Sequence, residues 1–329
     1  MPRIKKKKGT TRRRQNTKPE VKRGVGGYIW WLLLLVIGVF FYAYFFRTNH
    51  WLADEPYNLA LQTPDQNQIT FLSLDPTTDT VTLLSFPPNL VIQTAYGYGD
   101  YKVDSLLKLG QIEGLDDLLL TSSLQQTLGL PVYSLVKLDN SINSNTWQRE
   151  LKTNLILKSL TSTIPLKDAI KFIRQLNVVR ADKIDYIDLA ATRLVYEDIL
   201  RDESRVLKLD LKRLDGFVGS NLSSSAYRAN QPTVAIINTT SEPGLASRAT
   251  RILVNTGVDV VSQSDNLDHL EISKIIINTP QLKDTITTKL LTYFFSPQIE
   301  EGSTDSYRAD IVLFLGTDYA TYLNQKPVK

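Results

Sequence analysis

The chain has 329 residues, a formal net charge of +4, two histidines and no cysteine. The absence of cysteine excludes disulfide-stabilised domains and thiolate metal sites, and His50 and His269 alone leave little material for a Ser-His-Asp triad or a histidine-bound metal. The length is sufficient for an anchor and two ordinary domains.

The N-terminal tail, residues 1–27, is strongly basic. It holds eleven Lys or Arg residues against one acid, Glu20, whereas residues 28–329 carry 27 basic and 33 acidic side chains, a net of −6. A basic block of this kind can bind nucleic acid, but this one has no interleaved aromatic residues and directly precedes an apolar run. We therefore expect it to contact anionic membrane lipid rather than nucleic acid.

The apolar run over residues 28–46 (YIWWLLLLVIGVFFYAYFF) predicts one transmembrane helix. Its 19 uncharged residues span about 30 Å at a helical rise of about 1.5 Å per residue. Aromatic residues gather at both ends, as they do at membrane interfaces, and no small-residue cleavage site follows before Arg47. The pattern predicts a retained anchor in the cell membrane, with a cytoplasmic N-terminus and an extracytoplasmic bulk.

Residues 57–215 predict a mixed α/β domain. Alternating segments at 69–75 and 80–86 flank the turn sequence PTTD and predict a β-hairpin. Apolar residues at three and four spacing predict four helices, and Gly129 ends the second of them. The predicted helices cover 102–109, 115–128, 147–160 and 166–176, and further strands cover 131–139 and 183–190. The Gly- and Ser-rich segment 216–231 predicts a linker.

Residues 232–320 predict a second, smaller α/β domain, followed by a tail at 321–329. Pro243 near the start of one helix and Gly257 just past its end give typical boundary signals. The expected order is strand, helix, strand, strand, helix, strand, over 233–238, 241–257, 258–264, 274–278, 281–295 and 309–316.

No local motif identifies a catalytic centre. Gly97 and Gly99 lack the strand, helix and Lys-Ser/Thr context of a phosphate-binding loop. The adjacent acids Asp116 and Asp117 point in different directions and are typical of solvated surface. From the residues alone the catalytic residues are unknown and no metal site or cofactor is predicted.

Two segments of the C-terminal region carry a family resemblance. VAIINTTSEPGLASRATRILVNTGVDVV and ADIVLFLGTDY resemble the C-terminal domain of LytR-CpsA-Psr envelope proteins. The earlier segments ITFLSLDPTTDTVTLLSFP, KVDSLLKLG and LGLPVYSLVKLD are similar to the main domain of that family, over residues 57–215. The resemblance implies a cell-envelope protein with a divergent main domain.

Typical members of that family transfer a glycan polymer from a polyprenyl-pyrophosphate carrier onto peptidoglycan, with Mg²⁺, an acidic residue and several arginines. These groups neutralise the charge of the pyrophosphate. In this chain most of the matching positions are replaced: the family's R-S-D falls on Asp65-Gln66-Asn67, and its R-D falls on Pro88-Asn89. The resemblance retains as phosphate-binding candidates Lys102, Arg149 and Lys152, with Asp104 in place of an asparagine.

Two hypotheses follow from this pattern. The first is a non-catalytic protein that binds or scaffolds a cell-wall glycan or a polyprenyl-linked precursor. The second is an active Mg²⁺-dependent transferase whose charged groups come from other positions: Asp100, Asp104, Arg174 or Arg193. An adaptor that binds no carrier, with Arg149 and Lys152 on an ordinary exposed helix face, stays open. Convergence of Asn67, Asn89, Arg149 and Lys152 would favour a carrier site.

Overall fold

The computed structural model describes residues 30–39, 55–64, 68–142, 146–160, 164–199, 203–223, 231–266 and 268–324. Residues 30–39 of the expected membrane span are helical and their apolar side chains are exposed, while the rest of residues 28–46 lies outside the described residues. No helix in the described ranges has the length and apolar content needed to cross a bilayer. The transmembrane span, the basic tail and the localisation stay predictions.

The central sheet of residues 57–215 has the order β6-β1-β2-β3-β7. Its middle is the expected hairpin, β2 (Ile69–Asp75) and β3 (Thr80–Phe86), which pair antiparallel with Ile69 opposite Phe86. Strand β1 (Tyr57–Gln62) pairs antiparallel with β2 and parallel with β6 (Ser134–Lys137). Strand β7 (Ile184–Asp188) pairs parallel with β3 at the other side. The mixed α/β class predicted from the sequence is confirmed.

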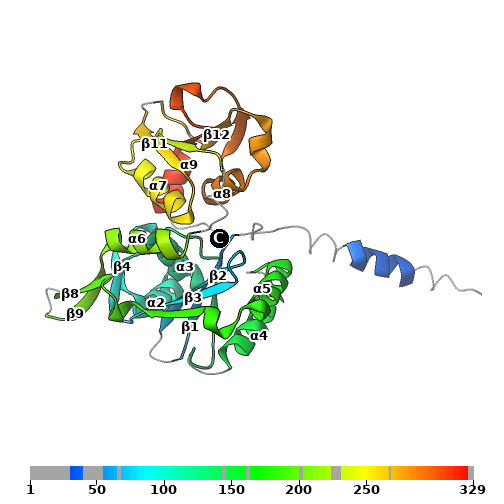
Figure 1. The fold of residues 1–329 in the computed structure, drawn as a ribbon, viewed down its shortest axis with the longest axis vertical. Helices are drawn as coiled ribbons and strands as arrows, with labels where there is room; N and C mark the ends of the chain where they lie inside the picture. The colour runs from blue at the N-terminus through cyan, green and yellow to red at the C-terminus, as the bar shows by residue number, and fades with distance from the viewer. Residues whose placement is uncertain are drawn as a thin grey trace, which may run out of the picture. The chain divides into compact units, whose positions relative to one another are not determined.

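Nearly every residue of the middle strands is buried, because helices cover both faces of this sheet. On one face Ala60, Phe71 and Leu84 pack with α2 (Val103–Glu113) and α3 (Asp117–Leu128). On the other face Leu59, Leu72 and Leu83 pack with α4 (Trp147–Leu160) and α5 (Leu166–Val178). Figure 1 shows α4 and α5 side by side. All four helices were expected near these positions.

A second, four-stranded sheet with the order β5-β4-β9-β8 was not expected. It joins short strands from distant parts of the sequence: Leu90 of β4 lies opposite Leu207 of β9. The strands are β4 (Leu90–Gln93), β5 (Asp100–Lys102), β8 (Val195–Ile199) and β9 (Arg205–Leu209).

The linker predicted at residues 216–231 is wrong for its first part. Helix α6 spans Leu211–Asn221, and its side chains Leu214 and Val218, together with Leu222 just past its end, are buried at a spacing of four. The apolar repeat begins before the window in which glycine and serine dominate, so the composition of that window concealed it. Residues 224–230 lie outside the described residues.

The C-terminal region forms a sheet with the order β11-β10-β14-β12-β13. Its strands and helices follow the predicted order, with β13 and α9 in addition. The elements are β10 (Val234–Asn238), α7 (Leu245–Thr256), β11 (Val260–Asp265), β12 (Lys274–Ile277), α8 (Ile286–Phe295), β13 (Gln298–Glu301), β14 (Ile311–Leu315) and α9 (Thr317–Asn324). Among the described residues, the buried hydrophobic clusters separate into sets within 57–222 and 234–320. The exact domain boundaries stay a prediction.

The G-T-D motif near the end of this region has a structural role. The Asp318 carboxylate accepts hydrogen bonds from the backbone N–H of Ser273 at 2.9 Å and from its hydroxyl at 2.7 Å. A Cβ on Gly316 would lie 2.7 Å from the backbone of Ile272 and of Ser273, so only glycine fits there. The motif therefore fixes the crossing between the segment before β12 and the start of α9.

Candidate functional site

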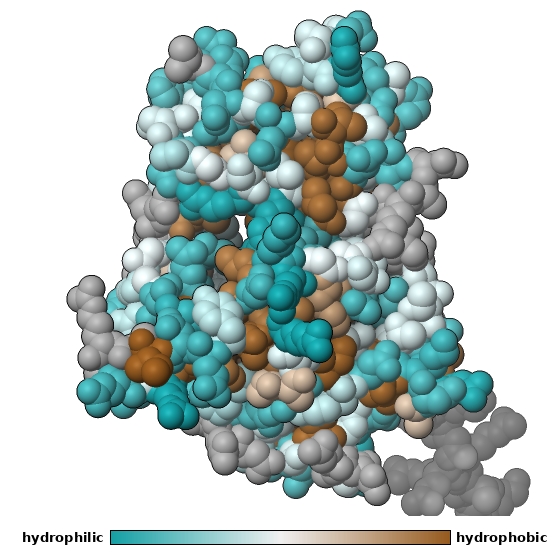
Figure 2. Space-filling model, turned by 60° about the vertical axis from the view of Figure 1, so that its left-hand side comes forward, coloured by the Kyte–Doolittle hydropathy of each residue, from teal (hydrophilic) through white to brown (hydrophobic). Residues whose placement is uncertain are grey.

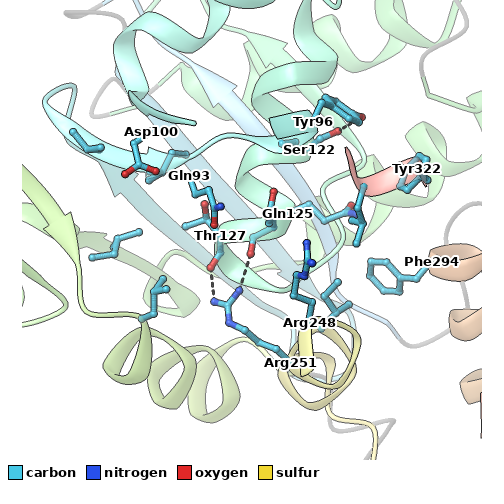
Figure 3. A pocket seen from close by; sticks show the side chains of 18 of the residues that line it. Gln93, Tyr96, Asp100, Ser122, Gln125, Thr127, Arg248, Arg251, Phe294 and Tyr322 are labelled. Atoms are coloured by element: carbon cyan, nitrogen blue, oxygen red, sulfur yellow. Dashed lines mark hydrogen bonds between the residues drawn. The ribbon is translucent and has the colours of Figure 1, made fainter. Parts of the chain in front are cut away.

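A cavity of about 450 Å³ lies where the second sheet and α3 meet α7, α8 and α9 (Figure 3). Its wall includes Gln93 and Asp100 from β4 and β5, and Tyr96 from the 3₁₀ turn Ala95–Gly97 between these strands. Helix α3 contributes polar side chains, and α7 contributes Arg248 and Arg251. The space-filling view shows that much of the visible face is hydrophilic, with hydrophobic side chains exposed in smaller groups between the polar ones (Figure 2).

Five aromatic rings line the cavity. They come from four different parts of the chain: Tyr96, Tyr196, Phe294, Tyr319 and Tyr322. Tyr319 packs edge-on against Phe295 at 4.8 Å between ring centroids, and burial raises its pKa above the ordinary tyrosine value. The rings give this wall a mostly apolar surface whose polar atoms are hydroxyl groups.

Tyr96 is held in an unusual backbone conformation. Its φ of 60° and ψ of 24° lie in the left-handed region, which costs a residue with a side chain about 1 kcal/mol or more. Two contacts to α3 hold the turn in place: the Ala95 N–H donates to the Ser123 hydroxyl at 3.0 Å, and the Tyr96 hydroxyl lies 2.9 Å from that of Ser122. Burial raises the pKa of Tyr96 to about 12, so its hydroxyl is neutral at physiological pH.

Amide and hydroxyl groups supply most of the polar lining. They are the side chains of Gln93, Ser122, Gln125, Gln126 and Thr127. Each of these groups can both donate and accept a hydrogen bond. In combination with the rings, they suit a neutral ligand that has hydroxyl groups and apolar ring faces.

Arg251 joins α7 to the C-terminal end of α3. Its Nη1 donates to the carbonyl of Gln126 at 2.7 Å and its Nη2 to that of Thr127 at 2.6 Å, while Nε donates to both carboxylate oxygens of Asp215 at 2.9 Å. The last carbonyls of a helix have no partner within the helix and carry partial negative charge, so a guanidinium there is favourable. Figure 3 shows the two bonds to α3.

Asn255, one turn after Arg251, completes this junction. Its Nδ2 donates to the carbonyl of Leu128 at 2.9 Å and to Asp215 Oδ1 at 3.0 Å. Gly129 ends α3 with a φ of 65°, and a Cβ on it would lie 2.6 Å from Asn255 Nδ2. Glycine is thus required at 129 for its left-handed backbone and for the close approach of α7.

The cationic side chains at the cavity all have carboxylate partners. Arg251 pairs with Asp215 at 2.6 Å, and Arg248 Nη2 lies 2.8 Å from Glu242 Oε1. Lys208 lies 2.7 Å from Asp198, and this hydrogen-bonded pair raises the pKa of the lysine and lowers that of the aspartate. A polyanionic ligand would have to compete with these three carboxylates for the cations.

The structure does not bring the predicted phosphate-binding residues together. Lys102 ends β5, on the α2–α3 side of the central sheet, whereas Arg149 and Lys152 lie on α4, which packs on the opposite face. Lys152 donates to Asn177 Oδ1 at 2.6 Å and Arg149 is exposed. Asn89 is exposed at the start of β4, and Asp65, Gln66 and Asn67 lie outside the described residues. The described members of this set thus form no common site.

The charged positions weighed for an active enzyme are also dispersed. Asp100 lines the cavity, Asp104 lies in the first turn of α2, and Arg174 and Arg193 are exposed on α5 and before β8. In the described part of the chain no three His, Cys, Asp or Glu side chains gather closely enough to hold a metal ion. One sequence signal does coincide with the cavity: the tyrosine- and glycine-rich segment at 96–101, which contributes Tyr96 and Asp100 to the lining.

Comparison with known proteins identifies the C-terminal region. Residues 231–319 match the family model described as "LytR cell envelope-related transcriptional attenuator". The resemblance predicted for the C-terminal segments is thus confirmed over residues 231–319, which match the LytR-type C-terminal domain. Among curated proteins no match was found.

Solved structures give more distant similarities. TagT of Bacillus subtilis is 13% identical over 52% of this chain and 91% of that chain, with a TM-score of 0.36. A LytR-CPS2A-psr family protein with bound octaprenyl pyrophosphate lipid, also TagT, is 14% identical over 51% and 90%, with a TM-score of 0.35. TagV of Bacillus subtilis is 11% identical over 50% and 95%, with a TM-score of 0.35.

Proposed function

We propose that this chain is a membrane-anchored, extracytoplasmic protein of the cell envelope that binds a cell-wall glycan in its cavity and does not catalyse glycan transfer. The observation that carries the proposal is the cavity lining of five aromatic rings with amide and hydroxyl groups. The match of residues 231–319 to the LytR-type model, which includes α7, α8 and Tyr319 of that lining, supports the envelope context.

The lining matches the chemistry of a sugar chain. Sugar rings present apolar C–H faces, which pack on aromatic rings, and hydroxyl groups, which bond to amides and hydroxyls. The cations of the cavity are already neutralised by Asp198, Asp215 and Glu242. An uncharged glycan requires no change in these ion pairs, whereas a pyrophosphate group would, so the lining favours the glycan over the head group of a carrier lipid.

The test uses the full chain in detergent micelles and soluble glycan strands released from peptidoglycan, with affinity measured by calorimetry. Tyr322→Ala removes a ring that is 51% exposed and lines the cavity. We expect affinity to fall about tenfold, because one stacked ring contributes about 1–1.5 kcal/mol. The control is Tyr186→Ala, a ring on β7 that is 45% exposed and lies outside the cavity lining.

Other results would contradict the proposed function or extend its ligand. Equal affinity of both variants, or no binding by the wild-type chain, would contradict the glycan site. Mg²⁺-dependent turnover of a glycan linked to polyprenyl pyrophosphate would refute the non-catalytic function and restore the alternative, an active transferase. Binding of that lipid-linked precursor without turnover, weakened by Tyr322→Ala, would keep the site and extend its ligand to the precursor.

A further inference from the structure

Helices α4 and α5 carry an outward face that combines basic and apolar side chains. On α4 the buried residues Trp147, Leu151 and Leu155 point to the sheet, which leaves the opposite side of the helix outward. Three apolar side chains gather on that side of the helix and are exposed: Ile156 at 44%, Leu157 at 56% and Leu160 at 70%. Helix α5 adds Ile170 at 40% and Val178 at 60%.

The same face is basic. Together α4 and α5 hold six Lys or Arg residues and two acids, and one of these acids, Asp168, is buried. The other, Glu150, accepts hydrogen bonds from the backbone of Asp139 and the side chain of Asn140. Residues 28–329 as a whole, this helix pair included, have the opposite balance, with a net charge of −6. Lys158 pairs with Asp117 of α3, and the other five cations give the helix pair its positive charge.

We propose that the outward face of α4 and α5, defined by Arg149, Ile156, Leu157, Leu160, Lys167, Ile170, Arg174 and Val178, docks on the surface of an anionic phospholipid bilayer. Amphipathic helices with mixed basic and apolar side chains bind in this way, with the apolar groups at the acyl boundary and the basic groups at the phosphates. The apolar groups distinguish a bilayer from a soluble polyanion, which needs only the charges.

The path of the chain is consistent with this geometry. Glu55, the first described residue after the predicted span, is buried near Lys171 of α5, whose positive charge partly offsets the rise in the Glu55 pKa that burial causes. The predicted membrane span ends nine residues earlier, and nine residues reach at most about 30 Å. This step rests on the predicted anchor. If residues 28–46 span a bilayer, the length of the chain keeps Glu55 within about 30 Å of the end of that span.

The test exploits the absence of cysteine, because one introduced cysteine is labelled uniquely. The full chain is reconstituted in vesicles of phosphatidylcholine with phosphatidylglycerol, and a polarity-sensitive fluorophore is placed by Leu157→Cys or, as a matched control, by Val261→Cys on β11, a side chain that is 46% exposed. Lipids with quenching acyl chains should quench the probe at 157 and leave the probe at 261 unquenched. The double variant Arg149→Glu/Arg174→Glu should weaken this contact about 30-fold.

Several outcomes would overturn the proposal. Equal quenching at 157 and 261 would exclude docking, and so would protection of position 157 by an anionic wall polymer but not by lipid. Crosslinking between two copies through position 157 would assign the face to a dimer. These readouts are independent of the glycan affinity at Tyr322, so failure of one proposal is distinguishable from failure of the other. Circular dichroism of each variant verifies its fold.

Discussion

Replacement of Arg251 by alanine tests whether one side chain couples the C-terminal region to α3. Its Nε and both Nη atoms bond two carbonyls of the last turn of α3 and the Asp215 carboxylate. Hydrogen bonds that involve a charged group contribute about 1.5–3 kcal/mol each. The Arg251 side chain is 25% exposed and Asp215 31%, so water replaces part of what is lost. We expect Arg251→Ala to lower the free energy of unfolding by about 3 kcal/mol.

Two further variants separate charge from geometry. Arg251→Lys keeps the positive charge but cannot bond two carbonyls and a carboxylate at once, so we expect it to lose about 2 kcal/mol. In a double-mutant cycle, Arg251→Ala with Asp215→Ala should show a coupling of about 1–2 kcal/mol, because the two residues are in direct contact. The measurement is urea denaturation of the full chain in detergent, followed by circular dichroism.

The control is Lys212→Ala, which removes an exposed cation on α6. Surface substitutions of this kind change stability by less than about 0.5 kcal/mol. If Arg251→Ala stayed within the same limit, the bonds to α3 would contribute nothing measurable, and the cavity would need another support. An effect in Arg251→Ala with no coupling to Asp215 would leave the α3 carbonyls as the partners that matter.

Three other variants test individual contacts. Burial raises the pKa of Glu55 from its ordinary 4.5 to about 8, so the stability that its protonated form contributes is complete below pH 4.5 and is lost as the pH rises through 8. Glu55→Gln, which stays neutral, should therefore raise Tm at pH 8.5 and much less at pH 5. An equal shift of Tm at both pH values would contradict this. In urea denaturation, Gly129→Ala should lower the free energy of unfolding by about 1 kcal/mol more than Gly114→Ala. Both glycines have a left-handed backbone, but only a Cβ at position 129 would contact Asn255. Equal losses of stability would exclude that close contact. Asp318→Asn should lower stability by about 2 kcal/mol in the same assay, because a charged acceptor of backbone and hydroxyl bonds is lost, and an unchanged midpoint would refute that role.

Local sequence patterns predicted the elements that local interactions form. The hairpin of β2 and β3 and the full extent of α4 follow from period-2 and period-3.6 apolar spacing. The sheet that contains β4 and β9 could not be predicted, because these strands have four and five residues and pair across more than a hundred positions of sequence. Register over that distance depends on the tertiary packing, which a single sequence does not reveal.

The candidate site could not be predicted from the sequence for a related reason. The family resemblance placed Lys102, Arg149 and Lys152 in one set, but nothing in the spacing of these residues says which face of the central sheet each helix covers. The structure puts α2 and α4 on opposite faces, so the set is divided by the sheet. The cavity instead depends on Arg251 and on rings from α8 and α9, which meet α3 only in the folded chain.

The same division of the sheet relates the two proposed surfaces. The cavity lies on the α3 side, whereas the basic and apolar face of α4 and α5 lies on the other side. If that face rests on a bilayer, the central sheet stands between the lipid and a glycan bound in the cavity. A fluorophore introduced by Tyr322→Cys should then escape the lipid quencher that reaches the probe of Leu157→Cys. Quenching of both probes would show that the cavity opens toward the membrane, and would favour a lipid-linked ligand over a glycan of the wall.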